Sequence, residues 1–195
     1  MNQKINEKNQ IIFRSCQSNE CLELQEIIEE EVGEFDLDAV PIAFLRLFEV
    51  ETSLSNNPNQ LLLGLLENLD DSIRSLLNPN YQEIRFPNLK PLQAKGLLFD
   101  LLMNGTAGGC NAIDDKNAVI ELIEKLFNWC GEGCYFYTNY NRKYIKRNPE
   151  REGYSYPYGG GSGWELFKTN DYSGDEGLIF VSPSKAGIFW FFGDD

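Results

Sequence analysis

Tyrosines and basic residues are concentrated in one stretch of the chain, residues 135–164, which reads YFYTNYNRKYIKRNPEREGYSYPYGGGSGW. It holds seven of the nine tyrosines and five of the seventeen lysines and arginines. Tyrosine provides a rigid ring with a hydrogen-bonding tip and arginine provides planar donors, so this composition is typical of a recognition surface. The residues expected to contact a ligand there are Tyr140, Arg142, Lys143, Tyr144, Arg147, Tyr156 and Tyr158.

The charge of the whole chain limits what this stretch can bind. Aromatic rings combined with cations suit phosphate groups or single-stranded nucleic acid. The net charge is −13, however, and the field of such a chain repels phosphates. Nucleic acid is therefore disfavoured, and a protein partner agrees better with the composition. The alternative is a surface excursion whose tyrosines pack locally and whose basic residues pair with acidic helices.

The chain contains no histidine. This excludes Ser-His-Asp and Cys-His nucleophiles, histidine general bases and histidine-ligated metals. Carboxylate, lysine and tyrosine chemistry remain, but no motif singles out a residue for them. The glycine-rich segment GTAGGCNAI lacks both the Lys-Ser/Thr of a P-loop and the spacing of a dinucleotide-binding loop. We therefore predict no catalytic residue and no cofactor.

Five cysteines, Cys16, Cys21, Cys110, Cys130 and Cys134, form two close pairs and one single residue. An odd number without an apolar leader indicates reduced thiols. The C-x4-C and C-x3-C spacings differ from common zinc knuckles, so we predict buried free thiols and no metal, with a zinc site as the alternative. The polar start MNQKINEKNQ and the lack of a run of about 20 apolar residues predict a soluble, cytoplasmic protein without a membrane segment.

Acidic residues are most concentrated near the N-terminus, where residues 1–75 carry fifteen acids against five bases. Ser18 or Asn19 can cap a helix over residues 20–32. Helical spacing places one apolar face on this helix, formed by Cys21, Leu24, Ile27, Ile28 and Val32. The opposite side is a solvated acidic ridge that contains Glu23, Glu26, Glu29 and Glu30. The residues expected to contact a partner are Glu23, Glu26, Glu30 and Glu34.

Periodicity and turn residues give the remaining elements. The predicted helices cover residues 20–32, 38–53, 57–77, 91–104 and 115–130. The predicted strands cover residues 10–15, 81–86, 134–138, 164–167, 178–181 and 188–192. The segment 38–53 is apolar on nearly all sides, which is typical of a helix in a core or an interface.

Helices followed by strands predict an α+β fold, with an N-terminal layer of about five helices packed on a small, mostly antiparallel C-terminal sheet. Residues 1–9 are expected to form a polar arm. Residues 10–195 are expected to form one domain, helical over about 18–131 and strand-rich over about 132–195. The final aromatic hairpin is apolar on both faces, which favours burial over an interaction patch.

These features predict an acidic protein-binding module whose partner is a basic protein. The composition is similar, in general terms and without a shared motif, to that of immunity and antitoxin proteins, which implies an inhibitor. One alternative is an enzyme acting on a small phosphorylated or nucleotide substrate held by the Tyr/Arg-rich loop. A further alternative is a structural subunit that self-associates through residues 178–192.

Overall fold

The computed structural model describes residues 11–32, 42–52, 57–76, 86–104, 113–139 and 174–193. Within these ranges six strands form one antiparallel sheet in the order β1-β2-β6-β5-β4-β3. The strands are β1 (Ile11–Ser15), β2 (Ile42–Thr52), β3 (Asn88–Leu89), β4 (Tyr135–Thr138), β5 (Gly174–Val181) and β6 (Lys185–Gly193). The helices are α1 (Asn19–Val32), α2 (Pro58–Glu67), α3 (Asp71–Leu76), α4 (Pro91–Asn104) and α5 (Lys116–Cys130).

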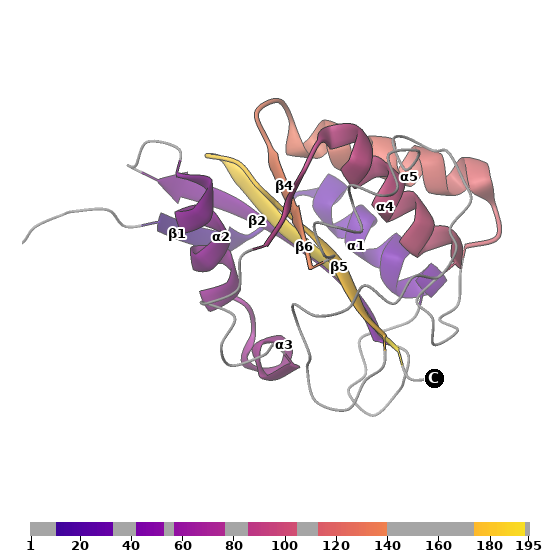
Figure 1. Ribbon diagram of the computed structural model, residues 1–195, viewed down its shortest axis with the longest axis horizontal. Helices are drawn as coiled ribbons and strands as arrows, with labels where there is room; N and C mark the ends of the chain where they lie inside the picture. Colours follow the sequence, from indigo (N-terminus) through magenta and orange to yellow (C-terminus); the bar gives the residue numbers. More distant parts are fainter. Residues whose placement is uncertain are drawn as a thin grey trace, which may run out of the picture.

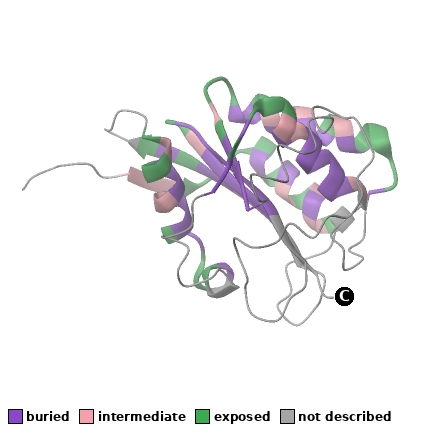
Figure 2. Ribbon diagram, in the orientation of Figure 1, coloured by how far each residue is buried: buried purple, intermediate pink, exposed green. Residues whose placement is uncertain are grey.

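Helices lie on both faces of the sheet (Figure 1). One core joins the sheet to α1, α4 and α5, and a second core joins it to α2 and α3. The central strands contribute to both cores, and Figure 2 shows them buried between the helical layers. The α+β class and the antiparallel sheet are confirmed. The predicted order, a helical layer from the N-terminal part and a sheet from the C-terminal part, is wrong.

Strand β2 is the main correction, because its sequence was expected to form a helix over residues 38–53. Leu45 and Leu47 enter the core beneath α1, while Phe44 and Phe48 enter the core beneath α2. A strand covered on both faces is apolar at nearly every position, and this pattern resembles that of a buried helix. Because β2 belongs to the sheet, the N-terminal part of the chain does not form a purely helical layer.

Strands β5 and β6 form the predicted hairpin at the centre of the sheet, closed by residues 182–184. Phe189 and Phe191 lie on the α1 side, and Ile188 and Trp190 on the α2 side, all fully buried. Burial is therefore confirmed for these side chains. The alternative, an aromatic patch through which copies associate, is wrong for the described part of the hairpin.

Two glycines of the hairpin make room for aromatic rings on the neighbouring strand. Gly177 lies opposite Trp190 and Gly187 lies opposite Phe180 in the register of β5 and β6. A Cβ atom on Gly177 would lie 2.0 Å from the Trp190 ring, and one on Gly187 would lie 2.2 Å from the Phe180 ring. The missing side chains let each ring lie flat over the partner strand, so the glycines are part of the packing.

The other elements follow the predicted boundaries closely. The helix expected over residues 57–77 divides into α2 and α3 around Asn68. Helix α5 is capped by Asp115, whose carboxylate accepts the Asn117 N–H at 2.8 Å. The predicted strand 164–167, and residues 81–85 of the strand predicted over 81–86, lie outside the described residues. Among the described helices, none has the length and apolar character needed to cross a membrane.

Replacing Trp190 with Ala should lower the free energy of unfolding by roughly 3–5 kcal/mol, because the ring is fully buried and would leave a cavity. Chemical denaturation measures this loss. Leu92→Ala is the control, since Leu92 is 53% exposed and its truncation should change stability by less than about 0.5 kcal/mol. Unchanged stability of the Trp190 variant, together with an altered oligomeric state, would instead assign the hairpin to an interface.

Candidate functional site: the acidic face of helix α1

Helix α1 begins at a corner that holds it closely to the sheet. The Ser18 hydroxyl accepts the Cys21 N–H at 3.3 Å, and the Ser18 carbonyl accepts the Leu22 N–H at 3.0 Å, so Ser18 is the N-cap. A disulfide joins Cys16, just after β1, to Cys21 in the first turn, with 6.1 Å between the Cα atoms. The expectation that these two cysteines are reduced thiols is therefore wrong.

One side of α1 is buried and the other is open to solvent. Cys21, Leu24 and Ile28 are buried as the apolar spacing predicted, and Ile27 is partly buried against the same core. Leu22, Glu26 and Glu30 recur at every fourth position and are exposed, so they form one line along the solvent side. Glu23 is exposed beside this line. We call Leu22, Glu23, Glu26 and Glu30 the acidic face.

The glutamates of α1 differ in whether they have a partner. The helix carries six glutamates and no basic residue. Glu23 accepts a hydrogen bond from the Lys125 ammonium of α5 at 3.1 Å, and Glu29 pairs with Arg46 of β2 at 3.0 Å. Glu26 and Glu30 form no ion pair with the residues that the structure describes. The middle of the acidic face therefore presents negative charge that no described basic residue compensates.

This charge works against the helix that carries it. Glu29 and Glu30 lie near the C-terminal end of α1, where the helix dipole already places partial negative charge. Glu26 and Glu30 are four residues apart, so their carboxylates repel each other across one turn. A charge pattern that costs stability, and that has no ion-pair partner among the described residues, is expected at a functional surface.

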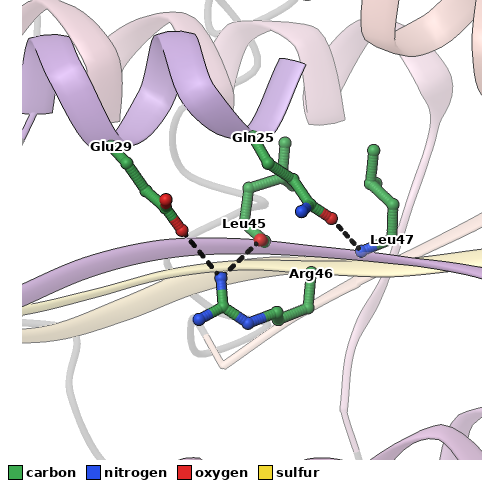
Figure 3. Close-up of polar contacts among 5 residues, drawn as sticks. All are labelled: Gln25, Glu29, Leu45, Arg46 and Leu47. Atoms are coloured by element: carbon green, nitrogen blue, oxygen red, sulfur yellow. Dashed lines mark hydrogen bonds and ion pairs between the residues drawn. The ribbon is translucent and has the colours of Figure 1, made fainter. Parts of the chain in front are cut away.

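A group of polar contacts fixes α1 to the edge of β2 where β1 ends (Figure 3). Cys16 directly follows β1, and its N–H donates to the Leu47 carbonyl at 2.8 Å. The Gln25 side chain accepts the Leu47 N–H at 3.2 Å. Beyond this point Arg46 donates to the Leu45 carbonyl and to Glu29, both at 3.0 Å. Side chains therefore replace the missing strand neighbour at this edge.

Arg46 reaches Glu29 from the other side of the sheet. Strand alternation places Arg46 on the same face as Phe44, and Figure 3 shows its guanidinium turned toward the strand, with the hydrogen bond to Glu29 of α1 crossing the strand. The Arg46 guanidinium carbon also lies 5.9 Å from the centre of the Phe44 ring. The pair is partly buried, so Glu29 serves to attach α1 to β2 and is not available on the exposed side of the helix.

Lys125 is the basic residue that pairs with the acidic face among the described contacts. The hydrogen bond that Lys125 donates to Glu23 and the charge of Glu23 raise the pKa of Lys125 above its usual value, and Glu121 at 3.9 Å adds to this. Lys125 therefore stays protonated and neutralises part of the negative charge at one side of α1. This neutralisation acts on Glu23, and within the described part of the chain Glu26 and Glu30 have no such counter-ion.

The predicted contact residues fall into two groups. Glu23, Glu26 and Glu30 share the exposed side of α1, as the helical spacing indicated. The remaining predicted contacts lie outside the described residues: Glu34, Tyr140, Arg142, Lys143, Tyr144, Arg147, Tyr156 and Tyr158. The sequence interpretation missed Gln25, Glu29 and Arg46 as a unit, because Arg46 was placed in a helix. It also missed exposed Leu22, whose four-residue spacing from Glu26 is a signal that could have found it.

The described residues contain no group of three or more histidine, cysteine or carboxylate side chains placed to hold a metal ion. A zinc site at Cys16 and Cys21 is excluded because the two sulfur atoms are bonded to each other. Cys130 and Cys134 are free thiols. Comparison of the chain with protein-family models, with curated proteins and with solved structures finds no match.

Gln25→Met should lower the free energy of unfolding by about 1–3 kcal/mol, because it leaves the Leu47 N–H at a partly buried edge without its acceptor. Gln25→Glu is the matched control, since its carboxylate can still accept this hydrogen bond and the loss should be smaller. Chemical denaturation of both variants gives the comparison. Equal losses would show that the Leu47 contact does not hold α1 in place.

Proposed function

We propose that the protein is an acidic binding module that docks a basic protein on the acidic face of α1. The observation that carries the proposal is the exposed charge of Glu26 and Glu30, which has no ion-pair partner among the residues that the structure describes and which costs the helix stability. A basic partner would supply the missing counter-charges. Part of the interaction energy would then come from removing repulsion that the free protein tolerates.

The placement of an apolar residue supports a protein partner over a small cation. Leu22 is 44% exposed on the same side of the helix as Glu26 and Glu30. Protein interfaces combine an apolar contact with surrounding polar and charged groups. A basic surface with a shallow apolar depression would fit Leu22 and the adjacent carboxylates together. A module of this kind suits an inhibitor of the immunity or antitoxin type, which neutralises a basic protein by covering it.

Charge on a rigid helix affects association most strongly at the encounter stage. Complementary fields raise the association rate, and added salt screens them over about 10 Å at 0.1 M. The contacts of α1 with β2 and the Cys16–Cys21 disulfide hold the acidic face in one orientation. We therefore expect fast, salt-sensitive binding with little rearrangement of α1.

The test compares Glu26→Gln/Glu30→Gln with the wild-type chain, using one purified partner captured from native extract at low salt. The variant should associate roughly tenfold more slowly at low salt, and the difference should shrink at high salt. Its free energy of unfolding should rise by about 0.2–0.5 kcal/mol, because a repulsive pair four residues apart is removed. Slower binding by a more stable protein cannot be attributed to unfolding. Reversal of both charges, Glu26→Lys/Glu30→Lys, should slow association further.

The matched control is Asp70→Asn/Glu132→Gln, which removes two exposed carboxylates outside α1 and gives the same net charge. If this control slows association as much as the α1 variant, binding depends on net charge and not on the acidic face. Capture of no stoichiometric partner at low salt would count against the proposal as a whole.

A loop variant separates the two surfaces that the sequence suggests. Changing Arg142, Lys143, Lys146 and Arg147 to Gln should leave binding of a basic partner unchanged or stronger, because repulsive charge is removed. Association rates with the same purified partner measure this effect. Loss of binding in the loop variant alone would assign recognition to the Tyr/Arg-rich loop. Indifference of binding to both the loop and the α1 variants would contradict the electrostatic basis of the proposal.

A further inference from the structure

A short glycine turn links the end of α5 to the start of β4 and brings two cysteines together. Gly131 and Gly133 have φ values of 74° and 77°, a conformation that residues with side chains rarely adopt. Cys130 is the last residue of α5, and Cys134 directly precedes β4. The chain therefore reverses between the two cysteines, and the Cys134 thiol lies close enough to raise the pKa of the Cys130 thiol.

The two thiols differ in access to solvent. Cys130 is 4% exposed and belongs to the core beneath α1, α4 and α5, whereas Cys134 is partly exposed. Burial is the main cause that raises the pKa of the Cys130 thiol, and the neighbouring Cys134 raises it further. Cys130 is therefore protonated and shielded at neutral pH, and the accessible member of the pair is Cys134.

A cationic side chain lies next to this pair. The Lys185 ammonium donates a hydrogen bond to the Trp129 carbonyl and lies 4.8 Å from the centre of the Trp129 ring. Its positive charge acts on Cys130 in the direction that favours the thiolate. An accessible thiol, a neighbouring second thiol and a nearby cation are the features of a cysteine pair that can be oxidised.

We propose that Cys130 and Cys134 are a redox pair that closes to a second disulfide when the chain meets a low-molecular-weight disulfide of the glutathione class. The Cys134 sulfur, as thiolate, attacks one sulfur of the reagent and forms a mixed disulfide, and one reagent thiol leaves. Cys130 then gives up its proton, attacks the Cys134 sulfur and expels the second reagent thiol. Two cysteines are oxidised to one disulfide, and one reagent disulfide is reduced to two thiols.

This pair differs from the disulfide at the other corner of the fold. Cys16 and Cys21 are both buried and already bonded to each other. The Cys130–Cys134 pair has one thiol at the surface, in a turn that connects a helix to a strand. Closure would tie the end of α5 to β4, next to the Lys185 contact with Trp129.

The test uses the full chain incubated with oxidised glutathione, then quenched in acid, alkylated in denaturant and digested with trypsin. Cys130 and Cys134 share the tryptic peptide from 126 to 142, and Cys110 falls on another. The expected product is this peptide with two hydrogens fewer and no alkyl group. A stable glutathione adduct on Cys134 beside an alkylated Cys130, or two alkylated thiols, would overturn the proposal.

Two variants test the order of the steps. Cys130→Ala removes the resolving thiol, so glutathione should remain bound to Cys134 at close to one equivalent. Cys134→Ser removes the accessible thiol, so Cys130 should react at least tenfold more slowly than Cys134 does in the wild-type chain, because it is buried. Equal rates would show that Cys134 is not the entry point and would overturn the assigned roles.

Discussion

Burial of the central strands on both faces is the constraint on which the rest of the structure depends. The β5–β6 hairpin and β2 present large apolar side chains to both sides of the sheet, so neither face can remain in water. Each face requires its own helical cover, and the chain supplies α1, α4 and α5 on one side and α2 and α3 on the other. Close packing of Trp190 over Gly177 and of Phe180 over Gly187 then fixes the register of the hairpin.

In this arrangement the apolar face of α1 covers one side of the sheet. The opposite face of α1 takes no part in the core and remains exposed to solvent. Its apolar residues meet the core, while Gln25 and the Glu29–Arg46 pair attach it to the edge of β2. The disulfide fixes its first turn. An element held by so many contacts can carry an unfavourable charge pattern on its exposed side without losing its place.

The sequence predicted local features well and the arrangement in space less well. The N-cap near Ser18, the helix between Pro91 and Asn104 and the terminal hairpin all depend on neighbouring residues, and all are present. Strand β2 was predicted as a helix because burial on two faces removes the alternation that identifies a strand. Whether such an apolar segment is a strand depends on distant segments of the chain, namely the helices that cover each face of the sheet.

The candidate site shows the same division. The exposure of Glu23, Glu26 and Glu30 follows from helical periodicity, so it could be predicted. The pairing of Glu29 with Arg46 could not, since it requires β2 to lie beneath α1. The Cys16–Cys21 disulfide was also missed, because an odd number of cysteines shows only that at least one is unpaired. The two cysteines are brought together by the corner between β1 and α1.

The ion pairs of α1 determine which glutamates of the helix keep an unpaired charge among the described residues. If every glutamate were exposed and unpaired, repulsion along the helix would be larger and the charge would be spread over a wide surface. Glu29 instead pairs with Arg46 and Glu23 with Lys125, one at each side of the exposed line. In the middle of the helix, the charge that has no ion-pair partner among the described residues is thereby left to Glu26 and Glu30, one turn apart and next to Leu22. A partner that matched only net charge would gain little from such a narrow strip, whereas one with two cations at that spacing would gain most.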